Sequence, residues 1–163
     1  MLENNFEIIE ADFKNQTHRK AIPYLLNEYT KDLLGYNKEL PEDVLNKIVD
    51  GIESFQTGIV ILAQKENEVI GMAILFLNFS TFKAQPLINI HDFTVLKSKR
   101  NQGIGKRILK KIEEIAIEKG CCKITLETQE NNIIARKLYN SFGFSDSFLD
   151  DEAGKQLFLT KEL

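Results

Sequence analysis

The chain has 163 residues, of which 43% are hydrophobic and 28% are charged, and its formal net charge is −3. This length suits one domain, and the composition is ordinary for a globular protein and excludes a disordered or fibrous one. The acidic balance, with a pI near 5.5, provides no broad basic surface for nucleic acid or anionic lipid. We therefore expect one domain over residues 1–163 that binds neither partner.

Two further features concern the compartment. No apolar run approaches the roughly 20 residues of a membrane-spanning helix, and residues 1–5 carry acid instead of the basic start of a secretory signal. Cys121 and Cys122 are adjacent, so they cannot staple a fold, and no His or Cys stands at ligand spacing from them. These features predict a cytoplasmic protein without a metal site.

The first third of the chain predicts one strand and two helices. Residues 6–10 alternate weakly between polar and apolar, as in a strand. Apolar residues then recur at helical spacing over residues 17–34, with Pro23 expected in the first turn or two. A second helix over residues 41–52 begins with proline and two acids, which suit the positive end of a helix dipole.

The middle of the chain predicts three strands. The β-branched residues 58–63 and the apolar residues 69–76, with polar residues between them, predict a β-hairpin. A loop over residues 80–86 is expected next. Residues 87–95 are apolar on both faces, which predicts a strand at the centre of the sheet.

The rest of the chain predicts a βαβ unit. A broad apolar stripe over residues 103–119 predicts a helix, and residues 123–128 predict the strand that follows it. A crossover helix makes this strand a parallel neighbour of the central one. A short helix over residues 133–141 and a last strand over residues 156–160 complete an α/β fold. We expect a mixed, mostly antiparallel sheet of six or seven strands with helices on both faces.

The segment RNQGIGK, residues 100–106, joins the central strand to its helix. Unpaired N–H groups at the helix start, two glycines and nearby Lys and Arg side chains predict a site for a polyphosphate. The spacing excludes two common nucleotide loops. Lys106 is followed by Arg107 where a Walker loop has Ser or Thr, and Ile108 stands where a dinucleotide loop has Gly or Ala.

The remaining pattern, Arg-x-x-Gly-x-Gly between a strand and a helix, resembles the coenzyme A loop of the GNAT superfamily of N-acetyltransferases. Residues 132–144, NIIARKLYNSFGF, resemble that superfamily's Asn-x-x-Ala-x-x-Leu-Tyr-x-x-x-Gly-Phe segment. Together the two motifs extend the resemblance over about residues 87–144. The resemblance implies a central parallel strand pair that splays to admit coenzyme A. It also implies direct transfer of an acetyl group from acetyl-CoA to an amine, without a metal.

The resemblance also implies roles for single residues. Backbone N–H groups of residues 102–106 would hold the diphosphate, residues 93–95 would pair with the pantetheine arm, and Tyr139 would stand beside the thioester sulfur. The implied coenzyme A site consists of Phe93, Thr94, Val95, Arg100, Asn101, Gln102, Gly103, Ile104, Gly105, Lys106, Asn132 and Tyr139.

The chemistry adds a catalytic set. An alkyl amine with a pKa of about 10.4 arrives protonated, so a group must accept its proton. His91 and Asp92 on the central strand are the candidates, directly or through water. Because a phenol with a pKa of about 10 is a weaker acid than a thiol at about 8.5, Tyr139 is expected to donate a hydrogen bond to sulfur. The alternatives are a core aromatic at Tyr139, a packed histidine at His91 and a loop-holding carboxylate at Asp92.

The acceptor is expected to be a primary amine of a small molecule or peptide, and the resemblance is compatible with a homodimer. Glu28 and Asp32 share a helix face that either attracts a cationic acceptor or is simply solvated. Two rival functions remain: a non-catalytic acyl-CoA sensor or scaffold of the same fold, and an acyltransferase that uses a longer acyl donor.

Overall fold

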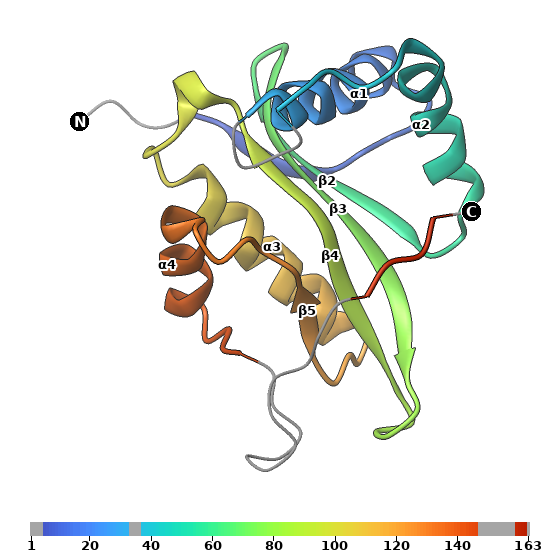
Figure 1. Cartoon of the computed structure of the whole chain (residues 1–163), viewed down its shortest axis with the longest axis vertical. Coiled ribbons are helices and arrows are strands. Elements are labelled where there is room, and N and C mark those ends of the chain that lie inside the picture. The colour runs from blue at the N-terminus through green and yellow to red at the C-terminus, as the bar shows by residue number, and fades with distance from the viewer. Residues whose placement is uncertain (1–4, 33–36, 147–158, 163) are drawn as a thin grey trace.

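In the computed structural model of the chain, residues 5–32, 37–146 and 159–162 are described. They form one sheet in the order β1-β2-β3-β4-β5 (Figure 1). The strands are β1 (Glu7–Glu10), β2 (Gly58–Lys65), β3 (Glu68–Ser80), β4 (Gln85–Val95) and β5 (Ile124–Leu126). All neighbours are antiparallel except β4 and β5, which pair in parallel as the βαβ pattern predicted.

Helices cover both faces of this sheet (Figure 1). They are α1 (Gln16–Lys31), α2 (Glu42–Ser54), α3 (Ile104–Glu118) and α4 (Ile133–Ser141). Side chains of α1 and α2 pack on one face and those of α3 and α4 on the other. Because successive strand residues point to opposite faces, Ile61 belongs to the α3/α4 core and Leu62 to the α1/α2 core. Burial on both faces explains why β2 and β3 are almost wholly apolar.

The first helix differs from its prediction. It begins at Gln16, where Asn15 Oδ1 accepts a hydrogen bond from Thr17 N at 2.8 Å. Pro23 therefore lies in the helix interior instead of its first two turns. The helix persists because Ile22 and Leu25 are completely buried against the sheet, which outweighs the backbone hydrogen bond that proline cannot make. The helix ends at Lys31, because Asp32 is extended, and so it stops before the predicted end at residue 34.

The prediction of a loop over residues 80–86 was wrong. Pairing of β3 with β4 continues to Ser80 and Gln85, so the connection is only the turn of residues 81–84. A proline near the end of a ribbon removes a single ladder hydrogen bond, and Pro86 does not stop the pairing. In total, the described part of the chain has five strands, fewer than the six or seven expected. Of the expected last strand, residues 156–158 lie outside the described residues.

Candidate active site

The parallel pairing of β4 and β5 stops partway along β4. The register partners are Ile88 with Ile124, Asn89 with Thr125, and Ile90 with Leu126. Strand β5 ends there, whereas β4 continues to Val95. Within the described part of the chain, residues 91–95 therefore have β3 on one side and no strand on the other. This is the splayed pair that the family resemblance implied, and it leaves a strand edge to which an extended ligand can add.

A β-bulge lies where the pairing stops. On β3, Ile74 pairs with Asp92, while the next residue, Leu75, pairs with Ile90. His91 is thus an extra residue in β4 without a partner of its own. A bulge of this kind changes which face of the sheet the following side chains reach.

The bulge places two titratable side chains on the α1/α2 face. Asp92 faces the same side of the sheet as its cross-strand partner Ile74, which is part of the α1/α2 core. Phe93 packs into the opposite core. The exposed ring of His91 lies 5.4 Å from the ring of Phe76, which packs on the α1/α2 core. Burial raises the pKa of Asp92, and the neighbouring His91 lowers it to a smaller extent. Without the bulge, Asp92 would point into the apolar core around α3 and α4.

The turn from β4 to α3 presents backbone N–H groups. Asn101 and Gly103 have left-handed φ values of 63° and 78°, and Gly103 is the N-cap residue of α3. Glycine has no side-chain oxygen, and the hydrogen bond from Arg107 N to Gly103 O, 3.2 Å long, opens the helical ladder. The N–H groups of residues 103–106 consequently have no acceptor in their own helix, and the helix dipole favours an anion there.

The two glycines of this turn serve different purposes. A Cβ added to Gly103 would meet nothing within 4 Å, so the position requires glycine for its left-handed backbone. A Cβ on Gly105 would lie 3.0 Å from Leu138 Cδ2 and 3.6 Å from Phe93 Cε1. Gly105 thus allows α3 to approach α4 and β4 closely. This second role, tight packing, was missed because periodicity does not reveal which helices will touch.

Tyr139 stands on α4 beside the free edge of β4. Its ring lies 5.9 Å from each of the rings of Phe93 and Phe144, in edge-to-face geometry. The residue is only 7% exposed. Burial, with a smaller contribution from Tyr29, raises the pKa of Tyr139 to about 12. The phenol is therefore protonated at neutral pH and can donate a hydrogen bond.

Asn132 begins α4. Its Oδ1 accepts a hydrogen bond from Ala135 N at 3.2 Å, which caps the helix. Asparagine just before a helical pattern is a known capping signal. The sequence analysis nevertheless predicted only a ligand-binding role for Asn132. Because Oδ1 is engaged, Nδ2 carries the donors that could serve a ligand.

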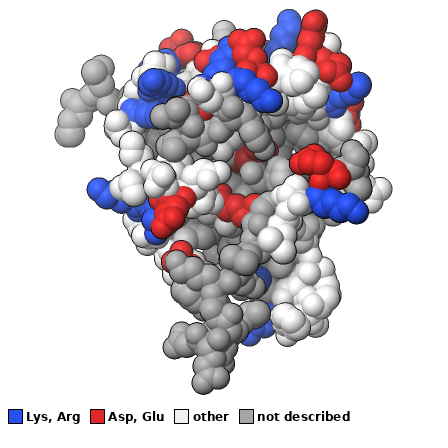
Figure 2. All heavy atoms as spheres, in the orientation of Figure 1, with Lys and Arg blue, Asp and Glu red and all other residues white. Residues whose placement is uncertain are grey.

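One large cleft brings the predicted site together. It is lined by all the predicted catalytic and coenzyme A residues except Gln102. Tyr29 and Asp32 of α1 line it as well. Figure 2 shows atoms of Asp and Glu residues near the centre of the face in view. Tyr29 was missed as a site residue because its spacing in α1 predicts only a core position. Glu28 forms an ion pair with Lys31 at 3.0 Å, as a solvated helix surface would.

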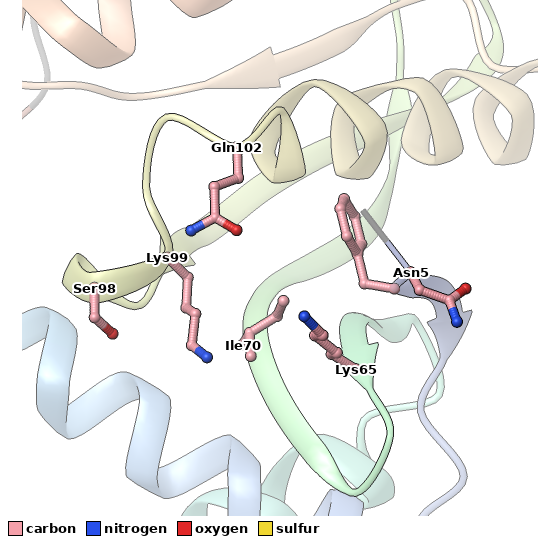
Figure 3. A pocket seen from close by; sticks show the side chains of 7 residues that line it. Asn5, Lys65, Ile70, Ser98, Lys99 and Gln102 are labelled. Atoms are coloured by element: carbon pink, nitrogen blue, oxygen red, sulfur yellow. The ribbon is translucent and has the colours of Figure 1, made fainter. Parts of the chain in front are cut away.

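Gln102 points the other way. Its side chain enters a smaller hollow behind the loop, shared with Lys99 and Ser98 on one side and with Asn5, Lys65 and Ile70 on the other (Figure 3). In this hollow Lys99 Nζ pairs with Glu68 Oε2 at 3.0 Å. The hollow contains neither Tyr139 nor Asp92, although Lys99 lines both the hollow and the cleft.

Over the described ranges, no helix is long and apolar enough to cross a membrane. Within the same residues, no group of three or more His, Cys, Asp or Glu side chains is placed to hold a metal ion.

The splayed parallel pair, the helix N-terminus beside it and the two-sided helix cover define a class of α/β protein to which acetyltransferases belong. A sequence profile described as the acetyltransferase (GNAT) family matches residues 19–144. The chain belongs to that family, as the two motifs predicted.

Individual relatives are also acetyltransferases by name. The thialysine N-epsilon-acetyltransferase of Bos taurus is 36% identical over 78 residues, which cover 48% of this chain and 45% of that protein. The uncharacterized N-acetyltransferase YycN of Bacillus subtilis is 25% identical over 148 residues, covering 86% of this chain and 94% of the relative. The crystal structure of a possible acetyltransferase from Clostridium difficile 630 superposes with a TM-score of 0.79 at 19% identity, over 97% of this chain and 98% of that one. The last similarity shows the fold.

Proposed function

We propose that this protein transfers the acetyl group of acetyl-coenzyme A to a primary amine of a small molecule or peptide, by direct attack in a ternary complex. One observation carries the proposal: a single cleft joins the free edge of β4, the N-terminus of α3 and the buried phenol of Tyr139. Membership of the acetyltransferase (GNAT) family supports the donor. The name of the thialysine acetyltransferase relative supports a small amine acceptor.

The residues of the cleft fit a nucleotide that carries a pantetheine arm. Backbone N–H groups of residues 102–106 would hold the diphosphate, and Gly103 leaves open space where a side chain would stand. The edge of β4 at residues 93–95, which pairs with no strand on that side within the described residues, would bond the amides of the arm as an added strand does. Asn132 Nδ2 would donate within the same slot. The bound coenzyme supplies an acetyl group already activated as a thioester.

Asp92 is the proposed proton acceptor. It lies on the α1/α2 face, on the side of the cleft lined by Tyr29 and opposite the α3/α4 core. Burial raises its pKa above the ordinary value of 3.8, and a carboxylate with a raised pKa is a stronger base. His91, next to it and exposed, is the alternative acceptor of the same proton. Both would take it from the ammonium form of the acceptor, directly or through water.

Tyr139 is the proposed donor to the departing sulfur. With a pKa of about 12, its phenol is a weaker acid than a thiol at about 8.5, so complete proton transfer to a thiolate is uphill. A hydrogen bond that strengthens as negative charge develops on sulfur stabilises the transition state without that transfer. A covalent route through Cys121 is disfavoured because burial raises the pKa of its thiol, which lowers the fraction of reactive thiolate.

The proposal is tested in two steps. Isothermal titration with coenzyme A and acetyl-CoA measures binding, and thiol release across a panel of amines measures turnover. A non-catalytic sensor would bind but release no thiol above the rate without amine. Ranking acetyl-, succinyl- and fatty-acyl-CoA by thermal shift separates an enzyme with a longer acyl donor. Absence of detectable affinity for coenzyme A and all its thioesters would refute the proposal.

A further inference from the structure

Arg100 connects three parts of the cleft. Its Nη2 donates to Asp32 Oδ2 at 2.8 Å, and its Nε donates to the backbone oxygen of Val95 at 3.1 Å. Asp32 is the C-cap residue of α1, and its backbone N–H donates to Tyr29 O at 3.1 Å. One guanidinium therefore ties the last turn of α1 to the end of β4, at the point where the loop to α3 begins.

These contacts fix the direction of the side chain. A guanidinium is planar and its donors have a fixed geometry, so two hydrogen bonds on Nε and Nη2 determine its orientation. The neighbouring residue, Asn101, and then Gly103 adopt left-handed backbone conformations. Arg100 is thus the anchored residue at which this left-handed turn begins.

We infer that Arg100 is a positioning residue and not a ligand of the diphosphate: paired with Asp32, it locks the loop of residues 100–106 to α1 and so couples the coenzyme A site to the acceptor side of the cleft. The inference rests on the proposed function for the identity of the ligand. The coupling to the acceptor side is inferred from Tyr29, which lies in the last turn of α1, three residues before Asp32, and lines the same cleft.

The alternative role, direct binding of the diphosphate by Arg100, has the opposite consequence for one substitution. If Asp32 merely competes with the ligand for the guanidinium, Asp32→Asn releases Arg100 and tightens coenzyme A binding. If the pair positions the loop, the same substitution loosens the loop and weakens binding. The sign of the change in Kd therefore separates the two roles.

The experiment is isothermal titration of coenzyme A into the full chain and its Asp32→Asn, Arg100→Lys and doubly substituted variants. A partly exposed ion pair contributes up to about 1 kcal/mol, so we expect each single variant to raise Kd roughly two- to fivefold. Both substitutions break the same ion pair, and Arg100→Lys also loses the bond to Val95 O. The double variant should therefore bind no more weakly than Arg100→Lys alone. Asp32→Glu, which keeps the carboxylate, should restore most of the affinity.

Glu68→Gln is the matched control. It removes the ion pair of Lys99 with Glu68, 3.0 Å long. That pair connects the residue just before the loop to the start of β3 instead of to α1. The control should leave the KM for the amine acceptor unchanged, whereas Asp32→Asn should raise that KM together with the KM for acetyl-CoA. Melting temperatures show that the variants are folded, and Asp32→Ala provides the same readouts if Asp32→Asn is not.

The outcomes are distinct. Unchanged or tighter binding of coenzyme A by folded Asp32→Asn would overturn the positioning role while leaving the proposed function intact. Additive losses in the double variant would also overturn it, because they would mean that the two side chains act separately. No binding of coenzyme A by the unsubstituted protein would instead refute the proposed function, and the inference with it.

Discussion

Replacing Tyr139 by Phe removes one oxygen atom and keeps the aromatic packing. The rings of Phe93 and Phe144, each 5.9 Å from that of Tyr139, still meet a ring of the same shape. A hydrogen bond to a charged group contributes about 1.5–3 kcal/mol. If that bond forms only as charge develops on sulfur, its loss lowers kcat roughly 10- to 100-fold and leaves the Kd for coenzyme A unchanged.

The same substitution has a second, independent signature in stability. Because burial raises the pKa of Tyr139 to about 12, the folded state favours the protonated phenol more strongly than the unfolded chain, where the pKa is about 10. That contribution is present below about pH 10 and is lost as the pH rises toward about 12. Relative to Tyr139→Phe, the unsubstituted protein should therefore lose roughly 2–3 kcal/mol of stability across this range.

The assay combines thiol release at saturating acetyl-CoA with urea denaturation at several alkaline pH values. Tyr24→Phe is the matched control, since it removes the hydroxyl of a tyrosine that is 54% exposed on α1, and it should change neither property. Turnover of Tyr139→Phe equal to that of the unsubstituted protein would refute the catalytic role. Equal alkaline stability curves would refute the burial argument.

Three other predictions concern the remaining site residues. Asp92→Asn should lower kcat/KM about 100-fold or more and remove the acidic limb of its pH profile; a profile altered by His91→Gln instead would assign the proton to His91. Gly103→Ala should raise the Kd for coenzyme A about tenfold in titration calorimetry because a left-handed alanine costs roughly 1–2 kcal/mol, and Gly103→Asn should recover part of the loss. Asn132→Ala should cost about 1 kcal/mol in thermal unfolding through loss of the α4 cap. Asn132→Asp should restore the stability but not the donors to the coenzyme, and equal coenzyme A affinity in both Asn132 variants and the unsubstituted protein would limit Asn132 to capping.

Much of the fold followed from local patterns. The helices α3 and α4 carry apolar stripes at helical spacing, and the short helix was predicted at its observed residues, 133–141. The parallel pairing of β4 with β5 followed from handedness and crossover length. The loop over residues 80–86 was predicted wrongly because polar residues and a proline are typical of loops, while the ladder between β3 and β4 depends on a partner strand that composition does not reveal.

The chain by itself determined the family and predicted the turn proposed to bind the diphosphate, because both depend on residues close together in sequence: two glycines, a helix start and the 132–144 segment. Only the tertiary structure decided which faces and partners those residues meet. The bulge that turns Asp92 toward α1 comes from register between strands, and the tight contact at Gly105 is with Leu138, 33 positions away. Arg100 is bound to Asp32, 68 positions away. Such contacts arise when separate elements pack into one core, and local spacing carries no record of them.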